Sequence, residues 1–147
     1  MGFQKTYIIL LSILSLISGG FIYLFLRKPP AVFQAFIPKN YMTAIRELSL
    51  ARNLSTNTPD WIIYNLPDCL WMFSFTLAIC VIWDFKLHRQ SKFWLAVCFL
   101  SGIGFEILQH MSLVPGVFDW KDLIFIISGA TLPLSFIFKI RIDEKNI

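Results

Sequence analysis

Charged residues are scarce in this sequence. Asp, Glu, Lys and Arg make up 15% of its 147 residues, whereas a typical soluble domain has roughly 25%. Hydrophobic residues make up 56% of the chain and the mean hydropathy is +0.66. Several apolar runs are long enough to reach across a bilayer core of about 30 Å. The composition therefore argues against an ordinary soluble domain and indicates an integral membrane protein.

The usual sequence signatures of catalysis and of redox structure are also missing. The three cysteines, Cys69, Cys80 and Cys98, all lie in apolar segments without C-x-x-C spacing, so neither a disulfide framework nor a zinc site is indicated. No Walker loop, dinucleotide fingerprint or G-x-S-x-G motif occurs. We therefore expect no cofactor, and a binding role is favoured over an enzymatic one.

The apolar runs predict one all-α membrane domain, a polytopic transmembrane helical bundle over residues 1–147. A short amphipathic helix is expected between spans one and two, because apolar residues recur there at helical spacing. The four expected spans are residues 6–26, 67–83, 93–113 and 120–138, and the amphipathic helix covers residues 40–54.

Pro67 interrupts the second apolar run and leaves two interpretations. Residues 61–66 approach the membrane and Pro67 lies in the first turn of the span, where its missing N–H costs little. Alternatively, one continuous helix is kinked at Pro67. The first is favoured, because Asp68 then lies near a helix N-terminus, where a negative charge is stabilised.

Small residues recur along the first span at about helical spacing, at Ser12, Ser15, Ser18 and Gly19. Such a face suits close packing against another helix. Simple tolerance of small residues in a membrane helix explains the pattern equally well.

An even number of spans places both termini on one side of the membrane. That side holds seven Lys and Arg residues and the other side holds six, so the bias is small. The short loop over residues 84–92 carries three cations, and the positive-inside rule places it, with both termini, in the cytoplasm. Arg27 and Lys28, which then lie outside, argue against this orientation. The net charge of +4 fits anionic headgroups, and no nucleic-acid partner is expected.

Under this topology, several polar residues meet near one membrane face. Some lie late in span three and the others at the starts of spans two and four. These candidate ligand-binding residues are Asp68, Glu106, Gln109, His110, Asp119 and Asp122.

Glu106 is the most informative of them. Eight residues, Ile107 to Val114, separate it from the Pro115-Gly116 turn, which corresponds to roughly 12–14 Å of helix. A carboxylate at that depth is costly against lipid, so it should face the bundle interior or a wet cavity. Its expected partners are Gln109, His110, or a cation from the amphipathic helix, Arg46 or Arg52.

Simpler structural roles compete for the other residues. Asp68, Asp119 and Asp122 can serve as helix starts, since carboxylates favour the first turn, and His110 can be an interfacial residue. A divalent ion on Glu106, His110 and the two aspartates is conceivable, but E-x-x-x-H is not the H-E-x-x-H of zinc proteases. No metal is therefore predicted.

The order of these residues resembles the VanZ-like family of small bacterial membrane proteins. The family motif runs roughly E-x-x-Q, then R-x-x-D-x-x-D-x-x-x-N-x-x-G, and the matching residues are Glu106, Gln109, Asp119, Asp122 and Gly129. The likeness covers about the last 45 residues, from Glu106 on. The family's arginine position is occupied by Gly116 and its asparagine position by Ile126.

The resemblance implies a bundle of four or five helices in the bacterial inner membrane, linked to the cell envelope and to glycopeptide antibiotic resistance. Membrane lipids, a lipid-linked envelope precursor and a membrane protein partner are the expected ligands of a polar pocket at the outer face. An accessory subunit of a larger membrane complex is the alternative function, and a metal-dependent lipid phosphatase or hydrolase is the second alternative.

Overall fold

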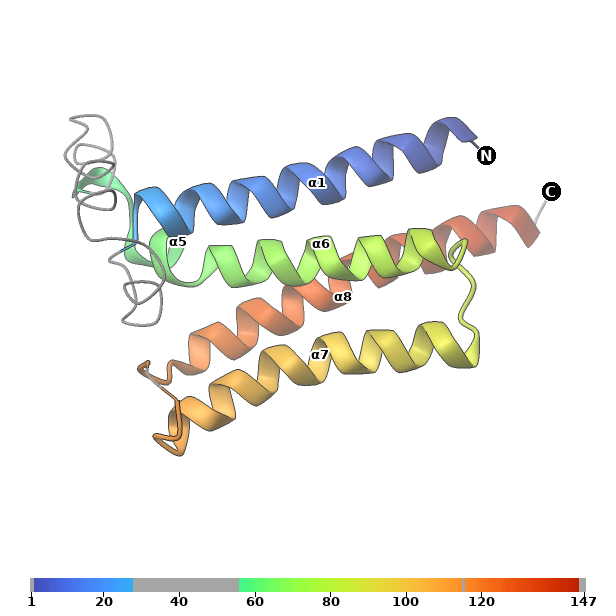
Figure 1. The fold of residues 1–147 in the computed structure, drawn as a ribbon. Helices are drawn as coiled ribbons and strands as arrows, with labels where there is room; N and C mark the ends of the chain where they lie inside the picture. The colour runs from blue at the N-terminus through green and yellow to red at the C-terminus, as the bar shows by residue number, and fades with distance from the viewer. Residues whose placement is uncertain (1, 28–55, 115, 146–147) are drawn as a thin grey trace.

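The computed structural model describes residues 2–27, 56–114 and 116–145, and within them all regular secondary structure is helical (Figure 1). This confirms the all-α prediction. The amphipathic helix expected at residues 40–54 lies outside the described residues. The helices are α1 (Gly2–Phe25), α5 (Asp60–Tyr64), α6 (Leu66–Ile82), α7 (Arg89–His110) and α8 (Trp120–Lys145).

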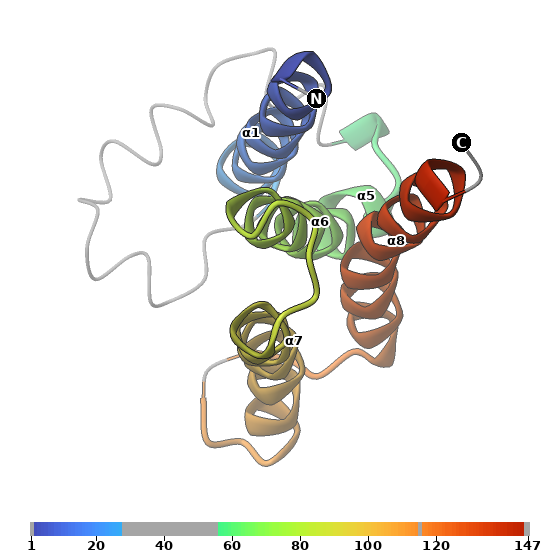
Figure 2. The ribbon, with the colours of Figure 1, turned by 90° about the vertical axis from the view of Figure 1, so that its right-hand side faces the viewer.

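The four long helices run up and down, so that each is antiparallel to the next long helix in the chain (Figure 1). Both termini lie at one end of the bundle, and α5 with the α7–α8 loop lies at the other. Figure 2 shows α6 at the centre, with α1, α7 and α8 around it. Helix α6 contacts all four other helices, and its position makes it the scaffold for both ends of the bundle.

Serines join α1 to α6 through reciprocal hydrogen bonds. The Ser12 hydroxyl donates to the Ser74 carbonyl at 2.9 Å, and the Ser74 hydroxyl donates to the Ser12 carbonyl at 2.8 Å. Ser15 and Gly19 are buried on the same face, and Ser18 is exposed. Of the two explanations for the small residues of this helix, the structure therefore favours close packing against another helix, with Ser18 outside the contact.

Helix α8 approaches α6 closely at Gly129. A Cβ atom added there would overlap the backbone carbonyl of Cys69, so only glycine allows the two backbones to approach this closely. Met72, Ile126 and Ala130 form the buried apolar cluster beside this contact. The crossing fixes the starts of α6 and α8 next to each other.

The chain breaks between α5 and α6 at Asn65, and Pro67 lies in the first turn of α6. This agrees with the first interpretation in the position of Pro67, because a new helix begins just before it instead of one helix continuing through it. The membrane approach of residues 61–66 stays a prediction. Pro67 is fully buried, and because the first-turn N–H groups have no partner within a helix, its missing donor costs little here.

At the opposite end, α6 stops in a left-handed turn. Asp84 and Phe85 have φ values of 52° and 56°, and the Phe85 N–H donates to the Cys80 carbonyl at 2.8 Å, as in a Schellman motif. The Lys5 side chain forms a salt bridge with Asp84. The hydrogen bond from Lys5, aided by its positive charge, lowers the pKa of Asp84.

Among the helices that the structure describes, two are long and apolar enough to cross a membrane, namely α1 over Lys5–Phe25 and α7 over Arg89–His110. Helix α6 is apolar but has 17 residues, about 26 Å. Most apolar side chains of α1 and α7 are exposed, among them Ile17 at 61% and Leu100 at 65%. A core helix of a soluble protein would bury such side chains.

Candidate functional site

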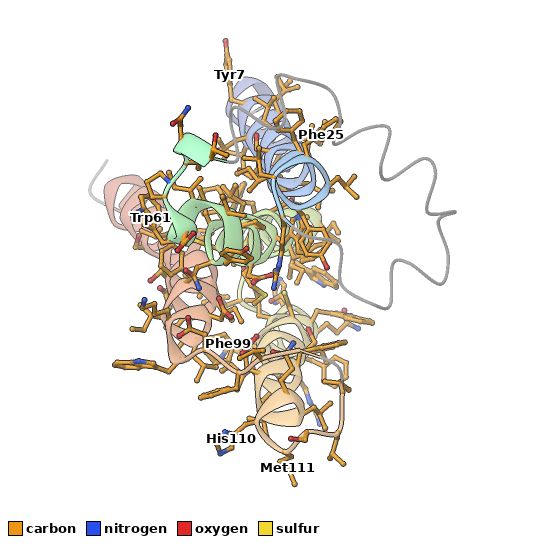
Figure 3. The ribbon with its side chains drawn as sticks, turned by 90° about the vertical axis from the view of Figure 1, so that its left-hand side faces the viewer. Tyr7, Phe25, Trp61, Phe99, His110 and Met111 are labelled. Carbon is orange, nitrogen blue, oxygen red and sulfur yellow. The ribbon has the colours of Figure 1, made fainter. Side chains whose placement is uncertain are left out.

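Three carboxylates from three different helices act electrostatically on one another at the end of the bundle opposite the termini. Asp68 lies in the first turn of α6, Glu106 near the end of α7, and Asp122 in the first turn of α8. We call these three residues the acidic cluster. Figure 3 views this end of the bundle, with Trp61 of α5 and His110 of α7 labelled.

Glu106 is buried although it carries a carboxylate. It is 6% exposed, and its Oε2 atom is the one buried side-chain polar atom in the described residues that has no hydrogen-bond partner. The backbone of Asp119 interacts with the same carboxylate. A buried acceptor without a donor is rare and costly in folded proteins, so Oε2 is a point where a ligand would gain most.

Glu106 lies closer to the end of its helix than the sequence suggested. Helix α7 ends at His110, and Ser112 follows with a φ of 58°. Four residues, about 6 Å of helix, thus separate Glu106 from the helix end. The estimate of 12–14 Å assumed that the helix continues to Val114, and it is wrong.

Asp122 is the second buried acid, 7% exposed. It accepts a hydrogen bond from the side-chain amide of Asn65, itself 4% exposed. The negative charges of Glu106 and Asp122 also act on each other. Asp122 is therefore a partnered member of the cluster, whereas Glu106 keeps one oxygen free of any partner.

Arg27, just after α1, supplies positive charge to the acidic cluster. Its charge acts on all three carboxylates. The guanidinium also lies over two aromatic rings, 5.2 Å from the Tyr23 centroid and 5.6 Å from that of Tyr64. These cation–π contacts hold the cation at the same end as the acids.

Gln109 and His110 lie apart from this arrangement. A Cβ atom at Gly116 would lie 2.7 Å from the Gln109 side-chain amide, so Gln109 packs on the α7–α8 loop. His110 is exposed, and its ring meets the Phe118 ring edge-on with centroids 4.8 Å apart. This surface position fits the simpler reading of His110 as an interfacial residue.

Asp119 starts helix α8. Its carboxylate accepts a hydrogen bond from the Lys121 N–H at 3.0 Å, and its carbonyl accepts one from the Asp122 N–H at 2.9 Å. This is the helix-start role that the sequence allowed. Asp119 also contributes its charge next to Asp122, so it lies at the border of the cluster.

The geometry does not suit a single metal ion. Within residues 2–27, 56–114 and 116–145, no three His, Cys, Asp or Glu side chains are grouped closely enough to hold one. His110, which was considered as a metal ligand, is exposed at the bundle surface.

Sequence reasoning missed Arg27 and Asn65. Arg27 was considered only as a marker of topology, yet a four-span arrangement already puts it on the same side as the acids. Three neighbouring carboxylates need a counter-charge, and that requirement could have identified it. Asn65 gave no such signal, because its partner is 57 residues away in sequence. Arg46 and Arg52, the expected cations, lie outside the described residues.

No protein-family model, no curated protein and no solved structure matches this chain.

Proposed function

We propose that this chain is a four-span, non-enzymatic membrane protein of the VanZ-like type, whose acidic cluster binds a polar ligand at the outer face of the bacterial inner membrane. A lipid headgroup, an envelope precursor or a partner protein would supply that ligand. The observation that carries the proposal is the buried Glu106 carboxylate, with one oxygen that has no hydrogen-bond partner.

The exposed apolar surface supports a bundle that is surrounded by lipid. Helices α1 and α7 pack on opposite sides of α6 (Figure 2), and large apolar side chains cover their outer faces, for example Leu14 at 60% and Phe105 at 61% exposed. An apolar surface of this extent is unstable in water and normal in a bilayer. Helices α6 and α8 lie beside α1 and α7 in the bundle. We therefore propose that all four long helices cross the membrane.

The position of Arg27 weakens one objection to the proposed orientation, in which both termini lie in the cytoplasm. Under the positive-inside rule, a cation outside argues against this orientation. Because Arg27 lies in the field of three carboxylates, its position is explained by the acidic cluster. The basic loop between α6 and α7 is then the feature that indicates, by the positive-inside rule, which side of the bundle is cytoplasmic.

The structure weakens one argument for the alternative function, an accessory subunit of a larger membrane complex. A face of small residues such as the one on α1 suits packing against another helix, and that helix could have belonged to a partner protein. Ser12, Ser15 and Gly19 are instead buried within the chain, where Ser12 is hydrogen-bonded to Ser74 of α6. A protein partner would therefore have to use the acidic cluster or the apolar outer faces.

Retention of a ligand tests the binding role. The full-length protein is purified in mild detergent, and the molecules that remain bound are extracted and identified by mass spectrometry. We expect a species that the native protein retains and that Glu106→Ala loses, while the variant still inserts in the membrane with unchanged helicity. If both proteins retain the same molecules, the cluster is not a binding site.

Reporter fusions test the topology. Alkaline phosphatase, which is active only outside the cytoplasm, is fused after Leu113 or after the last residue. We expect activity from the first fusion alone. Activity from both, or from neither, would show that α8 does not cross the membrane.

A further inference from the structure

The charge of the acidic cluster limits the ligands that it can bind. When they are ionised, Asp68, Glu106 and Asp122 supply three negative charges, and Arg27 offsets one of them. A phosphate or carboxylate group would meet net repulsion at the carboxylates. A ligand with a positive charge is attracted to all three carboxylates.

The hydrogen-bonding groups limit the ligand further. An ionised carboxylate only accepts hydrogen bonds. Asp122 already receives one from Asn65, whereas Glu106 Oε2 receives none. A ligand that fits must donate an N–H or O–H to Oε2. A buried acceptor left without a donor costs about 1–3 kcal/mol, and a donating ligand would remove that cost.

Among cations, a compact group with several donors suits this arrangement best. Ca²⁺ and Mg²⁺ take six or more oxygen ligands, waters included, and Zn²⁺ takes three or four protein ligands, whereas the described residues offer no group of three ligating His, Cys, Asp or Glu side chains. A primary ammonium group carries three N–H donors that point in different directions. It can therefore donate to Glu106 Oε2 while its charge is attracted by Asp68 and Asp122, which act electrostatically on the same site.

We infer that the acidic cluster binds a primary ammonium group, with Glu106 Oε2 accepting one of its N–H donors. The inference rests on the proposed function and specifies the chemistry of its ligand. The ammonium belongs either to an aminoethyl lipid headgroup or to a soluble amine. In both cases the bond to Glu106 is a charge-assisted hydrogen bond, which is about twice as strong as a neutral one.

Native mass spectrometry of the full-length protein in mild detergent tests this chemistry. The probes are phosphatidylethanolamine, phosphatidylcholine and phosphatidylglycerol with identical acyl chains. The choline headgroup keeps the positive charge but has no N–H donor. We expect phosphatidylethanolamine to bind about tenfold more tightly than phosphatidylcholine, the effect of one charge-assisted hydrogen bond. Equal binding of these two lipids, or a preference for phosphatidylglycerol, would overturn the inference.

Two matched variants assign the effect to the cluster. Glu106→Gln keeps the shape but removes the charge, so it should bind phosphatidylethanolamine no better than phosphatidylcholine. Asp60→Asn changes an exposed acid in α5 at the same end of the bundle and should keep the native preference. Circular dichroism checks that both variants are folded. An unchanged preference in folded Glu106→Gln would refute the role of Glu106.

Free ethanolamine distinguishes the two sources of the amine. Competition by millimolar ethanolamine indicates that the ammonium alone is recognised, whereas its failure to compete indicates that the lipid is recognised. Both results agree with the inference. If the purified native protein retains a ligand that depends on Glu106 but has no amine, the inference fails and the proposed function stands. If it retains no ligand that Glu106→Ala loses, the proposed function fails.

Discussion

The side-chain amide of Asn65 donates a hydrogen bond to the carboxylate of Asp122, and both side chains are buried. This bond connects the α5–α6 junction to the first turn of α8. The charge of Asp122 in turn acts on Asp68 and on Glu106. Asn65 thus has a structural role at the acidic cluster without being acidic itself. It gives Asp122 a hydrogen-bond partner, whereas the buried Oε2 atom of Glu106 has none.

Replacing Asn65 by Leu should destabilise the fold. The substitution removes the amide donor and leaves the Asp122 carboxylate buried beside an apolar group. We expect a loss of about 1–3 kcal/mol in the free energy of unfolding, because a buried acceptor keeps its desolvation cost when its donor is lost. The loss is measured by titration with SDS in mixed micelles.

A second substitution separates the loss of the bond from a loss of packing. Asp122→Asn in the Asn65→Leu background should recover part of the stability, because a neutral amide is less costly to bury than a carboxylate. Simple additivity of the two single changes would show that the residues do not interact.

Gly129 should not tolerate even one methyl group. In Gly129→Ala, the new Cβ would meet the Cys69 carbonyl, so α6 and α8 would have to separate. Overpacking of this kind typically costs about 1–3 kcal/mol. Gly104→Ala in α7 is the control, because a Cβ there meets nothing within 4 Å. Equal stability of the two variants would contradict the close helix crossing.

The serine pair between α1 and α6 should contribute modestly. Ser74→Ala removes the donor to the Ser12 carbonyl and the hydroxyl that lies 3.2 Å from the Ser12 hydroxyl. Hydrogen bonds between membrane helices average about 0.6 kcal/mol and reach about 1.7, and we expect a loss in that range. Ser18→Ala, at an exposed position of α1, should leave the unfolding curve unchanged. A comparable loss from both variants would refute the special role of the pair.

The approximate positions of the long helices could be predicted from the sequence, because long apolar runs and the polar segments between them indicate where such helices lie. The predicted second span, 67–83, differs from α6 (Leu66–Ile82) by one residue at each end. The ends of α7 were harder to predict. Its C-terminal turn uses Ser112 in a left-handed conformation, where glycine is the usual signal, and the apolar residues that follow suggested a longer helix.

The residues of the acidic cluster and their contacts could be predicted only in part from the sequence. Spacing and helix order placed Asp68, Glu106 and Asp122 near one face, and the structure brings these three together. Contacts between distant segments left no local signal, as the bond from Asn65 shows. Gln109 lies three residues after Glu106, and helical periodicity predicts that they share a face. The packing of Gln109 against Gly116 depends on the loop path, which periodicity does not describe.

The salt bridge between Lys5 and Asp84 gives a pH-dependent prediction at the opposite end of the bundle. The hydrogen bond from Lys5, with its charge, lowers the pKa of Asp84 in the folded protein. A lowered folded-state pKa means that the pair stabilises the fold at pH above the unfolded value of about 3.9. This contribution is lost as the pH falls through the folded-state pKa.

Lys5→Met should therefore raise the pKa of Asp84 toward its ordinary value and remove this pH dependence. The carboxyl carbon of Asp84, observed by NMR during an acid titration in micelles, reports the change directly. Lys86→Met is the matched control, because Lys86 acts on Asp84 by charge alone and more weakly than Lys5. We expect Lys86→Met to raise the pKa of Asp84 by less than Lys5→Met does. A larger increase in Lys86→Met than in Lys5→Met would show that the contact between α1 and the α6–α7 loop does not form in solution.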